Sequence, residues 1–156
     1  VAHPMMIGTH GDHAHEGDVI EEILFEDIDV LEHHEFQPGY LGVMAINAGD
    51  KNLVRNVTYR RIRIEPFEHG KVLDFQVKWN RDYNPTPGRG IWDILVEKVN
   101  IMSGDGEEPS VIAGYSQEFS VRGIEIRDFY RDGRKAESLE EAGIMVGEYV
   151  EDVRMV

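Results

Sequence analysis

Apolar residues recur along the chain in an eight-residue pattern, at its first, third, sixth and eighth places. Three clear copies span residues 23–30, 57–64 and 94–101, a looser copy spans 124–131, and residues 153–156 resemble the beginning of a fifth. The first and third residues alternate as in a β-strand, two polar residues follow, and the sixth and eighth residues alternate again. The pattern therefore predicts two short strands joined by a corner in each copy.

The copies begin 34, 37, 30 and 29 residues apart, which suits the coils of a solenoid. A second kind of apolar segment lies between the copies: Met5 to Gly8, Gly42 to Asn47, Val72 to Val77, Ser110 to Tyr115 and Gly143 to Gly147. Each coil thus contributes about three short strands, and stacked coils give parallel sheets around a shared interior. We expect an all-β fold, a right-handed parallel β-helix of about five short coils. Residues 1–156 would form one domain, either complete or the C-terminal part of a longer β-helix.

An alternating β/α fold is the competing architecture, because such a repeat has room for one strand and one helix. Ser138 to Ala142 is the one good helix candidate, since Ser138 can cap an N-terminus and helix formers follow. Gly143 would end that helix after about one turn. The β-branched residues at the repeat positions favour the β-helix.

The composition limits the partners of the chain. Thirty acidic residues against 16 basic ones give a formal net charge of -14, which opposes nucleic acid and anionic membrane surfaces. Neutral polysaccharides or oligosaccharides are tolerable ligands, whereas a polyuronate would need a local basic patch or bridging cations. No apolar run approaches the roughly 18 residues of a membrane span. The sequence contains no cysteine, so disulfides and thiolate chemistry are excluded.

Several phrases resemble polygalacturonase-type glycoside hydrolases, family twenty-eight and its relatives in the pectin-lyase-like superfamily. The phrases are residues 23–29, 56–65 and 83–91, and the resemblance covers Gly17 to Val156. It implies the last coils of a β-helix, a carbohydrate ligand and an extracellular or periplasmic location. The catalytic motifs of the family do not match, because Gly11-Asp12-His13 differs from Gly-His-Gly and Arg61-Ile62-Arg63 lacks the final lysine.

Two aspartates are candidates for catalysis. Glycoside hydrolysis needs one carboxylic acid to protonate the leaving oxygen and one carboxylate to activate water or attack carbon. Asp50 ends one connecting strand and Asp74 lies in the next, so stacking of equivalent positions would bring them within about 5 Å. The alternative is structural: Asp50 caps a turn and Asp74 accepts hydrogen bonds from loop amides.

The longest irregular stretch, residues 78–90, combines aromatic and basic side chains with prolines. Sugar faces stack on aromatic rings, so this loop is the candidate ligand site. The residues we expect to contact a ligand are Trp79, Arg81, Asp82, Tyr83 and Arg89. Alternatively, Tyr83 and Pro85 pack the loop on the coil below.

Residues 9–18 hold three histidines and three carboxylates. His10, His13 and His15 could reach one Zn²⁺ or Ni²⁺ if the loop folds back, with carboxylates orienting the imidazoles. The alternative is a solvated loop without any cofactor.

The leading hypothesis is a glycoside hydrolase-like β-helix module that binds or hydrolyses a polysaccharide along its parallel sheet. A second hypothesis is a non-catalytic structural or adhesive β-helix that forms homo-oligomers through its coil ends, since an end coil exposes unpaired strands. A third is a metal-dependent hydrolase that uses the His10 to His15 loop.

Overall fold

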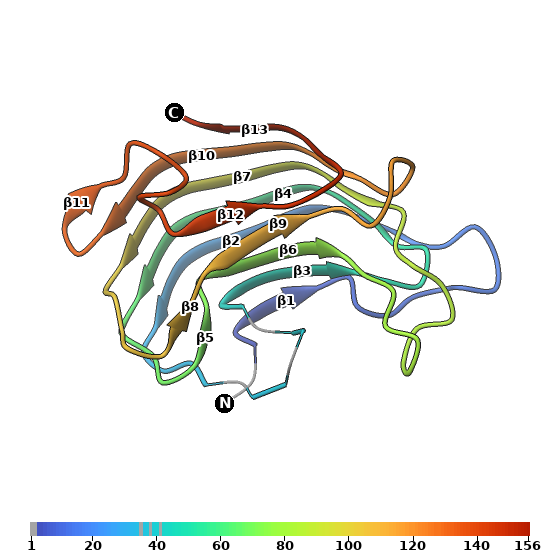
Figure 1. Cartoon of the computed structure of the whole chain (residues 1–156), viewed down its shortest axis with the longest axis horizontal. Coiled ribbons are helices and arrows are strands. Elements are labelled where there is room, and N and C mark those ends of the chain that lie inside the picture. The colour runs from blue at the N-terminus through green and yellow to red at the C-terminus, as the bar shows by residue number, and fades with distance from the viewer. Residues whose placement is uncertain (1–2, 35, 38, 41) are drawn as a thin grey trace.

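The chain forms a parallel β-solenoid of about four turns in a computed structural model that describes residues 3–34, 36–37, 39–40 and 42–156 (Figure 1). Each turn consists of a short strand followed by a long, bent strand. The short strands are β1 (Met5–Ile7), β3 (Met44–Ala48), β6 (Leu73–Val77), β9 (Ser110–Ala113) and β12 (Ile144–Val146). The long strands are β2 (Val19–Val30), β4 (Leu53–Ile64), β7 (Gly90–Ile101), β10 (Val121–Arg131) and β13 (Val150–Met155). The predicted all-β solenoid is confirmed, and its right hand stays a prediction.

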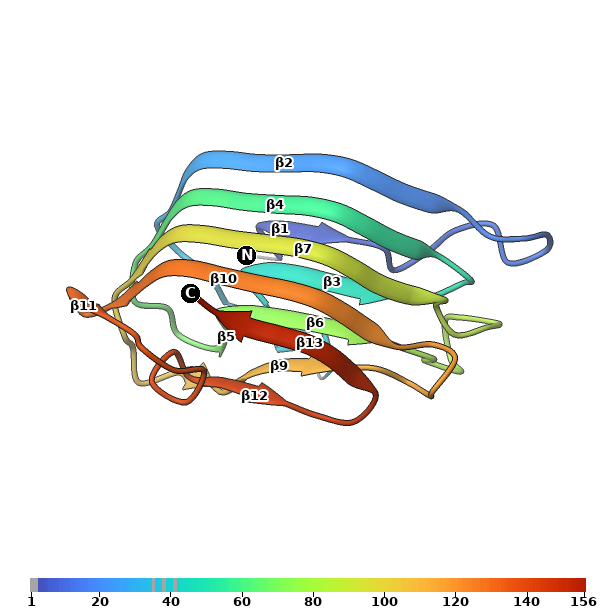
Figure 2. The same ribbon diagram turned by 90° about the horizontal axis from the view of Figure 1, so that it is seen from above.

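Two parallel sheets run along the stack. The short strands form one sheet in the order β1-β3-β6-β9-β12, and the long strands form the other, with β10 flanked by β7 and β13 (Figure 2). The register pairs Ile23 with Val57, Val57 with Ile94, Ile94 with Ile124 and Ile124 with Val153. The predicted copies are therefore the stacked units. Three small strands lie outside this scheme: β5 (Gly70–Lys71) pairs with β8 (Glu107–Glu108), and β11 (Arg134–Lys135) pairs with β10.

Residues with positive φ bend the long strands at two stacked rows. The row inside the eight-residue pattern consists of Asp27, Arg61, Lys98 and Asp128, with φ between 47° and 56°. The row before the pattern consists of Glu22, Asn56, Asp93, Gly123 and Asp152, with φ between 52° and 69°. Left-handed backbone is tolerated by Gly, Asn and Asp better than by other residues, which explains much of this composition. The strands β2, β4, β7 and β10 therefore have two corners each, and β13 has the first of them. The sequence pattern identified only the second corner.

Aromatic side chains stack in the interior between the two sheets. The ring of Tyr59 lies 5.0 Å from that of Phe25 and 5.8 Å from that of Phe75, both in nearly parallel orientation. Aliphatic residues fill the remaining inward positions, as at Ile62 and Ile94, which are 1% exposed. The apolar places of the repeat are thus the core.

The described residues contain no helix, and hence none long and apolar enough to cross a membrane. The segment that begins at Ser138 forms a single turn, in which Ala142 N donates to Ser138 O over 3.0 Å. The next amide, from Gly143, bonds instead to Glu140 O, so the turn does not continue. The β/α alternative is therefore excluded.

Candidate functional site

Two loops distant in sequence meet at one end of the coils, at the right of Figure 1. They are the blue loop after β1, residues 8–18, and the green loop after β6, residues 78–89. Asn84 is 2% exposed, and its side-chain Nδ2 donates to Thr9 O over 2.8 Å. Asn52 holds the first loop from below, donating to Gly8 O and His10 O over 2.8 and 3.0 Å. These two buried amides fix the backbone around His10.

Asp50 lies beneath the first loop and contacts His10. Its side chain is 5% exposed, and its Oδ2 lies 3.3 Å from His10 Nδ1 and accepts a 3.4 Å bond from Gly11 N. Among the described residues, its Oδ1 is buried with no hydrogen-bond partner. The imidazole itself is 64% exposed. A buried carboxylate thus orients a histidine whose ring faces outward.

A hollow of about 390 Å³ opens beside this pair. The residues that line it include Thr9, His10, Tyr40 and Tyr83. Tyr83 is 62% exposed. Three residues that the sequence assigned to separate roles therefore meet here: Asp50, His10 and Tyr83. Asp50 contacts His10, and His10 and Tyr83 line the hollow.

A second hollow of about 320 Å³ adjoins the first, because Tyr40 lines both. Lys78, Trp79 and Tyr115 also line it. We call the two hollows together the Tyr40 groove. The sequence did not identify Tyr40 and Tyr115 as residues of a binding site. Tyr40 has the pattern of a core-packing residue, and Tyr115 ends one of the connecting segments. Neither carried a motif that could have identified it.

Trp79 is held in a fixed orientation in the groove. Its Nε1 donates to Asn84 O over 3.1 Å, and its ring meets the ring of Tyr115 edge-on at 6.0 Å. The guanidinium of Arg81 lies 4.4 Å from the centre of the Trp79 ring. Asp82 is exposed on the adjoining turn, where its amide bonds to Asn80 Oδ1. Trp79 and Tyr83 therefore both face the groove, with Arg81 over the indole.

Arg89 ties loops together at the base of this region. Its Nε donates to Lys51 O over 2.6 Å, and its Nη2 donates to Asp18 O over 3.0 Å. Its role as a ligand contact stays a prediction, but two of its donors already bond the backbone.

Asp74 is buried in a separate polar cluster on β6. It accepts a 3.0 Å bond from Asn47 Nδ2, and the ammonium groups of Lys71 and Lys78 lie 3.6 and 3.9 Å from its carboxylate. Burial lowers the pKa of Lys78, while the negative charge of Asp74 acts in the opposite direction. The carboxylate is thus satisfied by its neighbours.

The expected stacking of Asp50 on Asp74 is wrong. The register pairs Asp74 with Ala45, and Asp50 follows Ala45 by five residues, beyond the end of β3. Asp50 lies in the turn that follows β3, with φ of 49°, whereas Asp74 lies within β6. The two aspartates therefore do not occupy the stacked positions that the expected pair requires.

The three histidines of the first loop are not brought together. His10 contacts Asp50, His15 Nδ1 lies 2.8 Å from Asp12 Oδ2, and His13 is exposed. Across the residues that the structure describes, no three His, Cys, Asp or Glu side chains are grouped so that they could hold a metal ion. The geometry of the loop therefore does not support the metal hypothesis.

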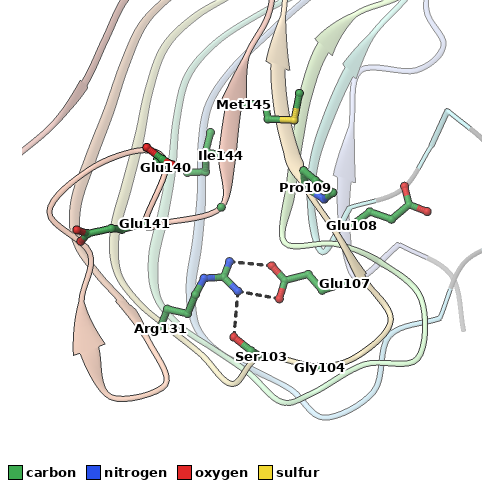
Figure 3. A pocket seen from close by; sticks show the side chains of 11 residues that line it. Ser103, Gly104, Glu107, Glu108, Pro109, Arg131, Glu140, Glu141, Ile144 and Met145 are labelled. Carbon is green, nitrogen blue, oxygen red and sulfur yellow. Dashed lines mark hydrogen bonds and ion pairs between the residues drawn. The ribbon is translucent and has the colours of Figure 1, made fainter.

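A larger hollow of about 610 Å³ lies at the opposite end of the coils (Figure 3). Arg131 and Glu107 face each other there in a bidentate ion pair, with contacts of 2.8 and 2.7 Å. The guanidinium also donates to Ser103 Oγ and Ala142 O. Arg131 on β10 is in register with Ile101 on β7, a position where the side chain points inward. The ion pair with Glu107 therefore ends this row of apolar side chains at β10. The charges of Arg131 and Glu107 are thus matched by each other. We take the Tyr40 groove as the candidate functional site, because residues from separate predicted sites meet there.

The fold and the site define the protein as a parallel β-solenoid with an aromatic groove at one end of its coils. Comparison with known proteins finds no matching family model, no matching curated protein and no matching solved structure.

Proposed function

We propose that the protein is a carbohydrate-binding β-solenoid module that holds a neutral glycan in the Tyr40 groove. The observation that carries the proposal is the set of aromatic side chains in two adjoining hollows: Tyr40, Tyr83, Trp79 and Tyr115. Aromatic rings offer flat apolar faces to sugars, and ordered hydrogen-bonding groups beside them fix orientation. The net charge of -14 favours a neutral glycan over a polyuronate.

Binding fits this geometry better than hydrolysis. Asp50 and Asp74 do not lie at stacked positions, and the Asp50 carboxylate contacts the His10 imidazole. The resemblance of the repeat phrases to polygalacturonase-type proteins is consistent with a glycan ligand, because many proteins with such phrases act on polysaccharides.

Calorimetric titration with a panel of neutral oligosaccharides tests the proposal. For a ligand found in the panel, Tyr83→Ala and Trp79→Ala should each weaken binding by about tenfold, the effect of losing one ring contact of about 1 kcal/mol or more. Phe36→Ala is the matched control, because Phe36 is 65% exposed and packs on His34 and His69, outside the groove.

Retained affinity in both groove variants would overturn the proposed site. No binding across the panel by the folded protein would favour the structural or adhesive alternative. New reducing ends that disappear in Asp50→Asn would instead make the protein a hydrolase that uses the His10–Asp50 pair.

A further inference from the structure

One long strand of the solenoid has a free edge. Within the described part of the chain, β2 pairs with a single neighbour, β4. Figure 2 shows β2 as the outermost long strand at the end of the stack away from β13. The N–H and C=O groups along its outer side therefore lack a strand partner. Such an edge can accept another strand through main-chain hydrogen bonds.

The apolar face beside this edge is incompletely covered. Ile20, Ile23, Phe25 and Ile28 are only partly buried. The residues at the same positions on β4, namely Val54, Val57, Tyr59 and Ile62, are at most 1% exposed. The strand β4 lies between β2 and β7, which together cover its apolar face. One further strand on the open side of β2 would cover the apolar face of β2 in the same way.

The outward side chains indicate what that strand carries. Across β2 and β4, carboxylates meet cations: Glu21 with Arg55 at 2.6 Å, Glu26 with Arg60 at 3.3 Å, Asp27 with Arg61 at 2.6 Å and Asp29 with Arg63 at 3.1 Å. Inside the sheet a charge can contact both neighbours, as Arg60 does by also bonding Glu97 at 2.5 Å. The β2 carboxylates contact a cation on the β4 side only, so their outer side is complementary to Arg or Lys.

A second copy of this chain does not supply those cations. If β13 of one copy continued the register onto β2 of another, Glu151 would lie opposite Glu21 and Asp152 opposite Glu22. Two β2 edges brought together would place one row of carboxylates against the other. Like charges directly opposite on neighbouring strands are destabilising.

We propose that β2 is a docking edge for an extended, basic polypeptide segment, which adds to the sheet as a strand. Its Arg or Lys side chains lie opposite the row Glu21, Glu26, Asp27 and Asp29, and its apolar side chains cover Ile23 and Phe25. This surface lies apart from the Tyr40 groove, so the docking proposal stands independently of glycan binding.

The probe is a labelled peptide with the sequence of residues 53–64, which carries the arginines of β4 in the matching order, followed by fluorescence anisotropy. We expect the chain to bind it and the amides of β2 to become protected from hydrogen exchange. A scrambled peptide of the same composition should bind at least tenfold more weakly, because β-strand addition requires the alternation of charged and apolar positions.

Substitutions on the edge separate docking from general attraction to an acidic protein. Glu26→Arg/Asp29→Arg should weaken binding of the peptide about tenfold, whereas Glu118→Arg/Glu137→Arg, with the same change of charge on exposed sites elsewhere, should weaken it much less. The milder Glu26→Gln/Asp29→Asn should give an intermediate loss with the fold kept.

Three outcomes would overturn the proposal: equal binding of the scrambled peptide, equal losses in the edge and control variants, or peptide binding without protection of β2. Protection of β2 in the free chain that rises with protein concentration would identify a second copy as the occupant instead.

Discussion

Tyr59 carries a hydroxyl group into the apolar stack between the sheets. The residue is fully buried between Phe25 and Phe75, and among the described residues its hydroxyl has no hydrogen-bond partner. Burial raises the pKa of Tyr59, which is consistent with a group removed from water. An unpaired buried polar group costs about 1 to 3 kcal/mol.

We therefore expect Tyr59→Phe to raise the free energy of unfolding by about 1 kcal/mol, since the ring stacking is kept and the unpaired hydroxyl is removed. Urea denaturation followed by circular dichroism measures the change. Tyr83→Phe, at an exposed position, should leave stability within about 0.5 kcal/mol. A less stable Tyr59→Phe variant would show that the hydroxyl has a partner in solution.

Asp132 joins two neighbouring coils through Ser103. Its carboxylate accepts a 2.6 Å bond from Ser103 Oγ and a 2.9 Å bond from Ser103 N, and these bonds lower the pKa of Asp132. Because the folded pKa lies below the unfolded one, this contribution is present above the usual pKa of 3.8 and is lost as the pH falls through the lowered pKa.

Titration of Asp132 by NMR should accordingly give a midpoint below 3.8. Ser103→Ala should move that midpoint upward, since the hydroxyl bond is the largest cause of the shift, while Ser116→Ala on another loop should not move it. An unchanged midpoint in Ser103→Ala would contradict the assignment of the bond.

At the scale of the elements, the corners of the long strands depend on backbone conformation more than on side-chain packing. Lys98 is an exposed residue with φ of 55°, and its neighbour two positions later, Asn100, is exposed in ordinary strand conformation. A β-branched residue is strained in the left-handed region, whereas glycine is not.

Gly and Val substitutions should therefore rank in opposite orders of stability at Lys98 and at Asn100. At Lys98, the Gly variant should be more stable than the Val variant by about 1 to 2 kcal/mol. At Asn100, Val should be the more stable by up to about 1 kcal/mol, because strands favour β-branched residues. Thermal unfolding of the four variants measures both orders, and the same order at both sites would refute a positive φ at Lys98.

Much of this architecture is predictable from the sequence because inward positions in a strand repeat every second residue. The spacings of the eight-residue pattern match the register of the stacked strands, as Ile23, Val57 and Ile94 show. The first row of corners was missed although four of its five residues are Asn, Asp or Gly, because these residues are also common in loops and Glu22 departs from the pattern.

The site was predictable only in part. Asp50, His10 and Tyr83 were identified as separate candidates, but their meeting depends on how two loops pack, which the repeat does not specify. The pairing of Asp50 with Asp74 failed because Asp74 lies near the start of β6, whereas Asp50 lies beyond the end of β3. The register places Ala45 beside Asp74. The stacked strands are marked by a periodic pattern of apolar residues in the sequence, whereas the conformation of the loops is not.

At the scale of the whole molecule, the net charge of -14 is arranged in rows rather than spread evenly. In one row of the long-strand sheet, carboxylates and cations alternate from coil to coil through the contacts of Glu26, Arg60 and Glu97. At the β2 edge the row ends on carboxylates. Those groups oppose stacking of identical copies and leave the edge open to a basic partner.

Neutralising the edge should therefore permit the self-association that its charges prevent. We expect Glu21→Gln/Glu26→Gln/Asp27→Asn/Asp29→Asn to dimerise through β2 at concentrations where the unmodified chain is a monomer by sedimentation velocity. The control changes four exposed carboxylates away from β2: Glu16→Gln/Glu118→Gln/Glu137→Gln/Glu148→Gln. Because it removes the same total charge and should stay monomeric, it separates the charge of the edge from the charge of the molecule. An unmodified chain that is already a dimer through β2 would show that hydrophobic burial and strand pairing outweigh the facing carboxylates.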